Sequence, residues 1–160
     1  MHDDVCMIVE TSIHSFSLWH HFANKVDFDA IDFTNLARSM GYQGISLSLN
    51  DINYRHLGGR GDDRMDRLSR HLKSHEMKLE VDTSNTTPVH MSEMLKVANR
   101  MGATSLRTYT HYRGDVDQMI KKTALDLKEV MDEASDLGII IVLENHEDFT
   151  GPELVKIIEL

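Results

Sequence analysis

The sequence of 160 residues is poor in cysteine, proline and aromatic side chains. Its single cysteine, Cys6, has no partner within the chain, so the sequence predicts neither an internal disulfide nor a thiolate metal cluster. With only 2 prolines and 9 glycines, the composition is unlike that of a linker or a fibrous protein. A chain of this length with 41% hydrophobic residues predicts one globular domain over residues 1–160.

The chain also lacks a long hydrophobic run and an excess of positive charge. Its longest apolar stretch, Ile139 to Leu143, is far shorter than the roughly 20 residues of a membrane helix. The first residues, Met1 to Asp4, are acidic where a secretory signal is basic. A net charge of -9 repels phosphate backbones. We therefore expect a cytoplasmic protein without a nucleic-acid or membrane partner, and we leave a homo-oligomer open.

Two hydrophobic periods alternate along the sequence. Segments with strand-like patterns are each followed by apolar residues at helical spacing, which gives five β-then-α units. Such units predict parallel neighbouring strands joined by right-handed crossovers. The five predicted strands are Met7–Ile13, Gly44–Asn50, Lys78–Asp82, Ser105–Tyr109 and Ile139–Leu143.

Three of these strands carry polar residues on one face. One face is apolar through Ile45, Leu47 and Leu49, then Leu79 and Val81, then Leu106 and Thr108. The opposite face carries Ser46, Ser48 and Asn50, then Glu80, Asp82 and Ser84, then Arg107, Tyr109 and His111. A closed barrel with a wet interior accepts such strands, whereas a sheet covered by helices on both faces does not. The alternative is a polar face that is simply exposed or paired with itself.

This arrangement predicts where the chemistry lies. Glu80 and Arg107 fall on neighbouring strands and are expected to pair inside the barrel. The carboxyl ends of barrel strands surround the active site, and here they carry His14, Asn50, Ser84, His111 and Glu144. The strand Ile139–Leu143 is apolar throughout, so it is expected to be buried on both faces.

Glu144 is the sharpest catalytic candidate, because it is a carboxylate directly after the most apolar strand. At that position it could bind a divalent cation or move a proton, or it could be the first solvated residue of a loop. Arg107, His111 and His146 are weaker candidates for substrate contact. Arg60, in the glycine-rich loop before Asp62, could contact an anionic substrate, but an ordinary turn is the better interpretation.

Several motifs together resemble a known superfamily. They are the segment Ile141–His146 followed by Thr150 and Glu153–Leu154, the opening Ser12–Ser17, and the turns at Met40–Ile45 and Met101–Ala103. In these motifs the chain resembles the sugar isomerase/epimerase superfamily, whose members have a xylose isomerase-like TIM barrel. The resemblance implies an α/β fold of the (β/α)8 TIM-barrel type, of which this sequence holds the first five βα units.

The resemblance also implies a chemistry. Members hold a divalent metal, often manganese or a similar ion, through a Glu, an Asp, a His and a second Glu on later strands, and Glu144 matches the first of these ligands. In epimerases this Glu also moves a proton next to a carbonyl, while the metal polarises the carbonyl and stabilises the enediolate. The implied activity is isomerisation or epimerisation of a small sugar, polyol or sugar acid. The alternatives are a dehydratase on the same barrel and a non-catalytic barrel subunit.

The sequence stops after the fifth unit, before the strands that would supply the other three ligands. We therefore expect a reading frame that continues for roughly 100 residues, given the usual barrel size of about 250. The first and fifth strands would be unpaired edges of an open sheet, and such edges favour association. As an isolated polypeptide the chain is expected to be inactive and either oligomeric or poorly soluble.

Overall fold

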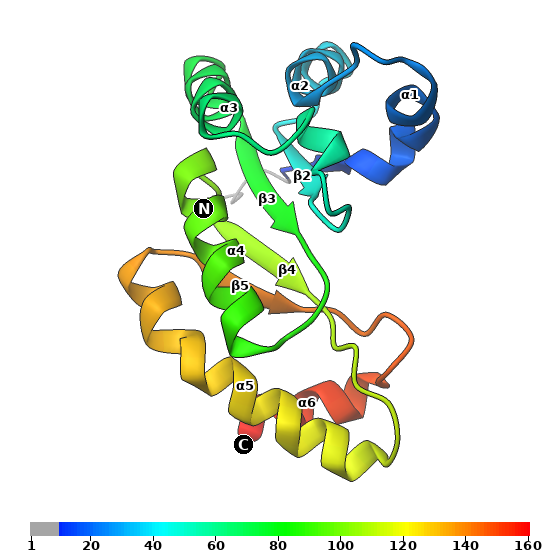
Figure 1. Cartoon of the computed structure of the whole chain (residues 1–160), viewed down its shortest axis with the longest axis vertical. Coiled ribbons are helices and arrows are strands. Elements are labelled where there is room, and N and C mark those ends of the chain that lie inside the picture. The colour runs from blue at the N-terminus through cyan, green and yellow to red at the C-terminus, as the bar shows by residue number, and fades with distance from the viewer. Residues whose placement is uncertain (1–9) are drawn as a thin grey trace, which may run out of the picture.

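The computed structural model describes residues 10–160, which form one sheet of five parallel strands (Figure 1). The strands lie in chain order and are β1 (Ser12–His14), β2 (Gly44–Ser48), β3 (Lys78–Asp82), β4 (Ser105–Thr108) and β5 (Ile140–Leu143). This confirms the expected series of βα units. The predicted first strand began at Met7, and its first three residues lie outside the described part of the chain.

Helices connect the strands and follow the last one. They are η1 (Ser15–Leu18), α1 (Trp19–Asn24), α2 (Ala30–Ser39), η2 (Arg55–Leu57), α3 (Asp62–Ser74), α4 (Pro88–Met101), α5 (Val116–Asp136) and α6 (Gly151–Glu159). Local sequence sets their ends. Asp29 and Thr150 begin α2 and α6 as capping boxes, and Gly102 ends α4 with a φ of +77°. No helix within residues 10–160 is long and apolar enough to cross a membrane.

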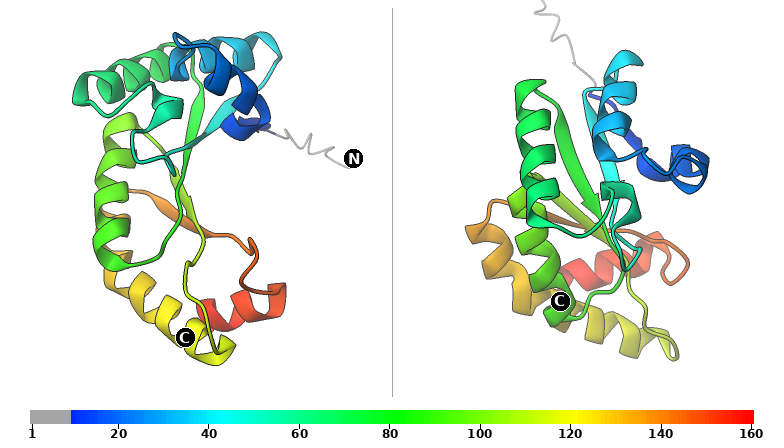
Figure 2. Two further views of the ribbon diagram at one scale, coloured as in Figure 1. Left: turned by 45° about the vertical axis from the view of Figure 1, so that its right-hand side comes forward. Right: turned by 45° about the horizontal axis from the view of Figure 1, so that its top comes forward.

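Helices α2 to α5 lie along one side of a curved sheet, and the other side is open (Figure 2). The side chains of Leu47, Val81 and Leu106 are 0% exposed and belong to the main hydrophobic core, together with apolar residues of these helices. The polar alternate residues Ser46, Glu80 and Arg107 line a pocket instead. The predicted separation of an apolar and a polar strand face is therefore confirmed in β2, β3 and β4.

The prediction that the fifth strand is buried on both faces is wrong. Ile140 is 68% exposed, and the remaining residues of β5 are half-buried. The reason is the position of the strand, because β5 pairs with β4 and no other strand of residues 10–160 pairs with it. Ile158 of the neighbouring helix α6 is 78% exposed as well. Within the described residues, β1 and β5 are thus the two sheet edges that the sequence predicted.

Candidate functional site

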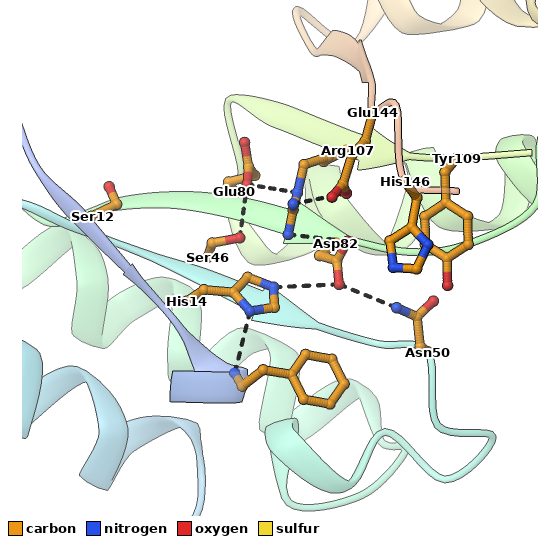
Figure 3. Close-up of a pocket in the computed structure, with 11 residues that line it drawn as sticks. Ser12, His14, Ser46, Asn50, Glu80, Asp82, Arg107, Tyr109, Glu144 and His146 are labelled. Atoms are coloured by element: carbon orange, nitrogen blue, oxygen red, sulfur yellow. Dashed lines mark hydrogen bonds and ion pairs between the residues drawn. The ribbon is translucent and has the colours of Figure 1, made fainter. Parts of the chain in front are cut away.

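A pocket of about 580 Å³ lies on the polar side of the sheet and extends to the carboxyl ends of its strands (Figure 3). All five strands, or the loops directly after them, contribute to it. Its lining residues are Ser12, His14, Phe16, Ser46, Asn50, Glu80, Asp82, Arg107, Tyr109, Glu144 and His146. The alternation of β2 to β4 accounts for this composition, since every second residue of a strand points to the same side.

Arg107 lies at the centre of the pocket among three carboxylates. Its Nη1 is 2.8 Å from Glu144 Oε2, its Nη2 is 3.3 Å from Asp82 Oδ1, and its Nε is 3.3 Å from Glu80 Oε1. Parallel pairing brings these groups together, because Asp82 is in register with Arg107, and Glu144 follows directly after β5. The predicted pair of Glu80 and Arg107 is confirmed, and the guanidinium joins β3, β4 and the end of β5.

Asp82 is a second meeting point, and its side chain is 5% exposed. Its Oδ2 accepts a hydrogen bond from Asn50 Nδ2 at 3.1 Å and lies 3.4 Å from His14 Nε2. The backbone N–H of Phe16 donates to His14 Nδ1 at 3.3 Å, so in the neutral ring the proton is on Nε2, the nitrogen that faces Asp82. His14 therefore presents a hydrogen-bond donor to this carboxylate.

Two pairs of stacked aromatic rings also line the pocket, and Figure 3 labels one of them, Tyr109 with His146. The rings of Tyr109 and His146 are parallel within 13°, with centroids 4.4 Å apart. The rings of His14 and Phe16 are parallel within 19°, with centroids 5.4 Å apart. The pocket therefore combines carboxylates, hydroxyl and amide groups with flat aromatic faces.

Two further histidines lie close to the pocket residues but are held in polar contacts of their own. His56 Nδ1 is 2.8 Å from Ser15 Oγ, and its ring stacks on Phe22. His90 Nε2 is 2.9 Å from Thr83 Oγ1. Burial lowers the pKa of both imidazoles from the usual value, which favours their neutral forms. Neither residue lines the pocket.

The structure brings together most of the residues that the sequence singled out. Glu144, Arg107, His146, His14 and Asn50 all line the pocket. His111 does not, and its exposed ring lies against Tyr109 with centroids 5.3 Å apart. Strand β4 ends at Thr108, so the two-residue alternation that placed His111 on the polar face no longer applies there. Ser84, which follows the end of β3, is likewise absent from the lining.

Two lining residues, Asp82 and Phe16, are not among the candidates that the sequence predicts. The alternation places Asp82 on the polar face, and its position as a carboxylate at the end of a strand is itself a signal for the pocket. The sequence predicts no strand or helix at Phe16. In the structure Phe16 belongs to the short helix η1 that follows β1, and this helix positions its ring at the pocket. The glycine-rich loop forms the expected turn and bend before α3 begins at Asp62. Arg60 lies over the Tyr54 ring, with 4.3 Å to the ring centroid, and is not part of the pocket lining.

The described residues do not by themselves fit a resident metal ion. Among residues 10–160 no group of three or more His, Cys, Asp or Glu side chains is arranged to hold one. Glu144, which the sequence resemblance predicts to be a metal ligand, is paired with Arg107. The carboxylates of this pocket converge on a guanidinium.

Fold and site together define a domain of the TIM-barrel type, with a polar interior and a pocket at the carboxyl ends of its strands. No family model matches the chain. Among curated proteins it is similar to the uncharacterized protein YihM of Escherichia coli K12, with 23% identity over 128 residues. That match covers 80% of this chain and 39% of YihM.

Several solved structures resemble the chain in fold. The chain is similar to the IolI protein with a bound zinc atom (TM-score 0.72, 14% identity) and to D-psicose 3-epimerase in the presence of D-fructose (TM-score 0.71, 12% identity). A D-tagatose 3-epimerase-like protein follows with a TM-score of 0.66 and 14% identity. Each match covers 94% of this chain, which spans 58%, 59% and 60% of the respective structures. The resemblance to xylose isomerase-like sugar isomerases and epimerases is thereby confirmed for the fold.

Proposed function

We propose that this chain forms the first five βα units of a (β/α)8 barrel that isomerises or epimerises a small sugar, polyol or sugar acid. The observation that carries the proposal is the position of Glu144. This carboxylate comes directly after β5, faces the pocket and is held at 2.8 Å by Arg107. The fold neighbours include two proteins named as ketose epimerases or epimerase-like, one of them crystallised in the presence of D-fructose.

Glu144 is the proposed base in this reaction. Its carboxylate removes the proton from the carbon next to the substrate carbonyl, and in an isomerisation it returns this proton to the neighbouring carbon while a proton moves between the two oxygens. In an epimerisation a second acid on the opposite face of the enediolate must deliver the proton to the same carbon. Arg107 fixes the carboxylate by a charge-assisted hydrogen bond, so the base is oriented before the substrate arrives. We propose Arg107 and His146 as substrate contacts from within the pocket. A contact through His111 also stays a prediction, although this side chain lies outside the lining.

A divalent ion is part of the proposal for the whole protein. A bound zinc atom is named for the IolI structure, and this supports a divalent metal in the whole protein. Glu144 would supply one ligand, and the other ligands would come from strands outside this sequence. When bound, such an ion would polarise the substrate carbonyl.

The test is the substitution Glu144→Gln in the whole protein, assayed on a panel of ketoses and keto-polyols. Gln keeps the size of the side chain but cannot accept a proton as a carboxylate does. Turnover should fall by about 10²- to 10⁴-fold, the usual contribution of a general base. Metal content, measured by plasma spectrometry, should fall as well, and the circular dichroism spectrum should not change.

Glu147→Gln is the matched control, because Glu147 is an exposed carboxylate three residues further along the same loop. It removes the same charge without touching the pocket. Full activity and metal content in Glu144→Gln would contradict the proposal. Dehydrated products in place of isomers would show that the barrel is a lyase.

A further inference from the structure

His56, in the short helix η2, is a half-buried titratable side chain that the proposed reaction does not use. Its Nδ1 lies 2.8 Å from Ser15 Oγ, and Ser15 is 0% exposed. Ser15 Oγ also accepts a hydrogen bond from the backbone N–H of Ser48 in β2, at 3.0 Å. Ser15 therefore connects the beginning of η1 with both β2 and η2.

Ser15 stands in the chain between His14 and Phe16, and both of these residues line the pocket (Figure 3). Because the three residues are consecutive, the contacts that hold Ser15 also restrict the backbone that carries its two neighbours. The ring of His56 packs edge-on against the Phe16 ring, with centroids 5.1 Å apart and a tilt of 74°. His56 thus supports the wall formed by His14 and Phe16 from outside the pocket lining.

The contacts of Ser15 determine the protonation state in which His56 can give this support. The hydroxyl oxygen accepts from the Ser48 N–H, so the hydroxyl hydrogen is available to donate, and His56 Nδ1 is the acceptor that the described residues offer it. A neutral ring with its proton on Nε2 satisfies the hydroxyl. A protonated ring carries hydrogen on both nitrogens, so the buried hydroxyl would face a donor and lose its acceptor.

The surroundings of His56 determine when it takes up a proton. His56 and Phe16 both line a second cavity of about 250 Å³, through which water reaches the ring. The titratable groups that face the ring come from four places: His14 after β1, Asp51 and Arg55 after β2, and Asp82 of β3. Burial lowers the pKa of His56, the neighbouring imidazole and guanidinium lower it too, and the two aspartates raise it less. The ring is therefore neutral near pH 7 and gains its proton as the pH falls.

We propose that His56 is a positioning residue, which holds the His14–Phe16 wall of the pocket as a neutral imidazole and releases it when protonated. The kinetic consequences rest on the proposed function, whereas the protonation state of His56 does not. The wall follows β1, and the proposed base Glu144 follows β5 at the other edge of the described sheet. Protonation of His56 should therefore weaken substrate binding and raise KM with little effect on kcat. Loss of the base would instead lower kcat.

The first measurement follows the imidazole ¹⁵N resonances of the whole protein between about pH 8 and about pH 5. Resonances that are missing from His56→Asn belong to His56. Near pH 7 they should show a neutral ring with its proton on Nε2, and the ring should gain a second proton below the usual histidine pKa of about 6.5. The backbone amide resonances of Phe16 and Ser48 should follow the same titration in the wild type and not in His56→Asn.

These spectra test the proposal without an assay of activity. A proton on Nδ1 near pH 7, or a ring that is already charged there, would overturn it. Amide resonances of Phe16 and Ser48 that ignore the titration of His56 would overturn it as well, because the ring would then not hold this segment.

The second measurement compares the pH profiles of KM and kcat for a ketose that the panel assay identifies as a substrate. In the wild type, KM should rise by about 2- to 10-fold as His56 is protonated, which is the equivalent of losing one ordinary hydrogen bond. In His56→Asn the side-chain oxygen takes the place of Nδ1 as the acceptor for Ser15 but does not titrate. Its KM should stay near the neutral-pH value of the wild type. Ser15→Ala breaks the contact without removing the imidazole, so its KM should already be raised at neutral pH.

His71→Gln is the matched control. His71 lies on α3 outside the pocket lining, and burial lowers its pKa as well. Gln keeps a donor for the contact of His71 Nε2 with Asn35. This variant should retain the rise of KM that the wild type shows.

The outcomes separate this inference from the proposed function. If KM rises equally in the wild type and in His56→Asn, or if His71→Gln abolishes the rise, the positioning role of His56 is overturned and the isomerase proposal stands. If no ketose is converted, the proposed function fails, and the spectra alone decide whether His56 holds the segment from Ser15 to Phe16 in its neutral form.

Discussion

The two faces of strands β2, β3 and β4 are built from the same segments and differ in almost every physical respect. On the helix side, Leu47, Val81 and Leu106 are 0% exposed and packed in the main core. On the pocket side, Ser46, Glu80 and Arg107 are linked by hydrogen bonds and ion pairs. The apolar face stabilises the fold because it removes apolar surface from water. The polar face must offset the desolvation of its charged groups by pairing them. Substitutions on the two faces should therefore lower the stability of the protein for different physical reasons.

The largest effect is expected on the helix side. Leu47→Ala should lower the free energy of unfolding by ~4 kcal/mol, because it leaves a cavity in a fully buried, well-packed position. Urea denaturation followed by circular dichroism measures this loss. Leu125→Ala is the control, since Leu125 is 68% exposed on α5 and should change stability little. Equal losses in the two variants would contradict the assignment of Leu47 to the core.

A smaller loss of stability is expected for Arg107, at the centre of the pocket side. Arg107→Met should lower the free energy of unfolding by about 3 kcal/mol, which is the lower end of the range for breaking a buried ion pair. The lower end applies because Arg107 is 22% exposed, so water can partly hydrate the carboxylates that lose their partner. The denaturation midpoint of this variant should also depend more on salt, since salt screens the repulsion among Glu80, Asp82 and Glu144.

Arg100→Met provides the comparison for Arg107→Met. Arg100 also binds two carboxylates, Asp62 and Asp66, but on the protein surface. Exposed ion pairs contribute little, so its loss should be much smaller than that at Arg107. If the two arginine variants were equally stable, the ion pairs of the pocket would contribute no more to stability than a surface ion pair does.

The difference between the faces also explains how much the sequence could predict. Strict alternation in Gly44–Asn50, Lys78–Asp82 and Ser105–Tyr109 determines both faces, and it correctly places Glu80 opposite the core and beside Arg107. The helix boundaries at Asp29 and Thr150 follow from local capping chemistry.

Other features of the structure could not be predicted from the alternation of apolar and polar residues. The run Ile139–Leu143 is apolar, but its exposure is determined by the absence of a strand beyond β5 within residues 10–160. His111 lies beyond the end of β4, where the direction of a side chain depends on loop geometry. The convergence of Asp82, His14 and Asn50 requires the register of three strands, which a single sequence does not show.

The smallest effect is expected at Ser48, which lies on the polar face and is nevertheless buried, with 4% exposure. Its hydroxyl oxygen accepts hydrogen bonds from Asn50, at 3.2 Å from Nδ2 and 3.5 Å from the backbone nitrogen. Ser48→Ala removes this acceptor but leaves Asn50 Nδ2 its hydrogen bond to Asp82. The backbone N–H of Asn50 loses its acceptor, but Asn50 is exposed and water can replace it. The loss of stability should therefore be about 1 kcal/mol, close to that of one ordinary hydrogen bond. Chemical denaturation of Ser48→Ala beside Leu47→Ala tests adjacent residues on opposite faces. A loss at Ser48 as large as that at Leu47 would show that the polar face supports the fold as strongly as the core does.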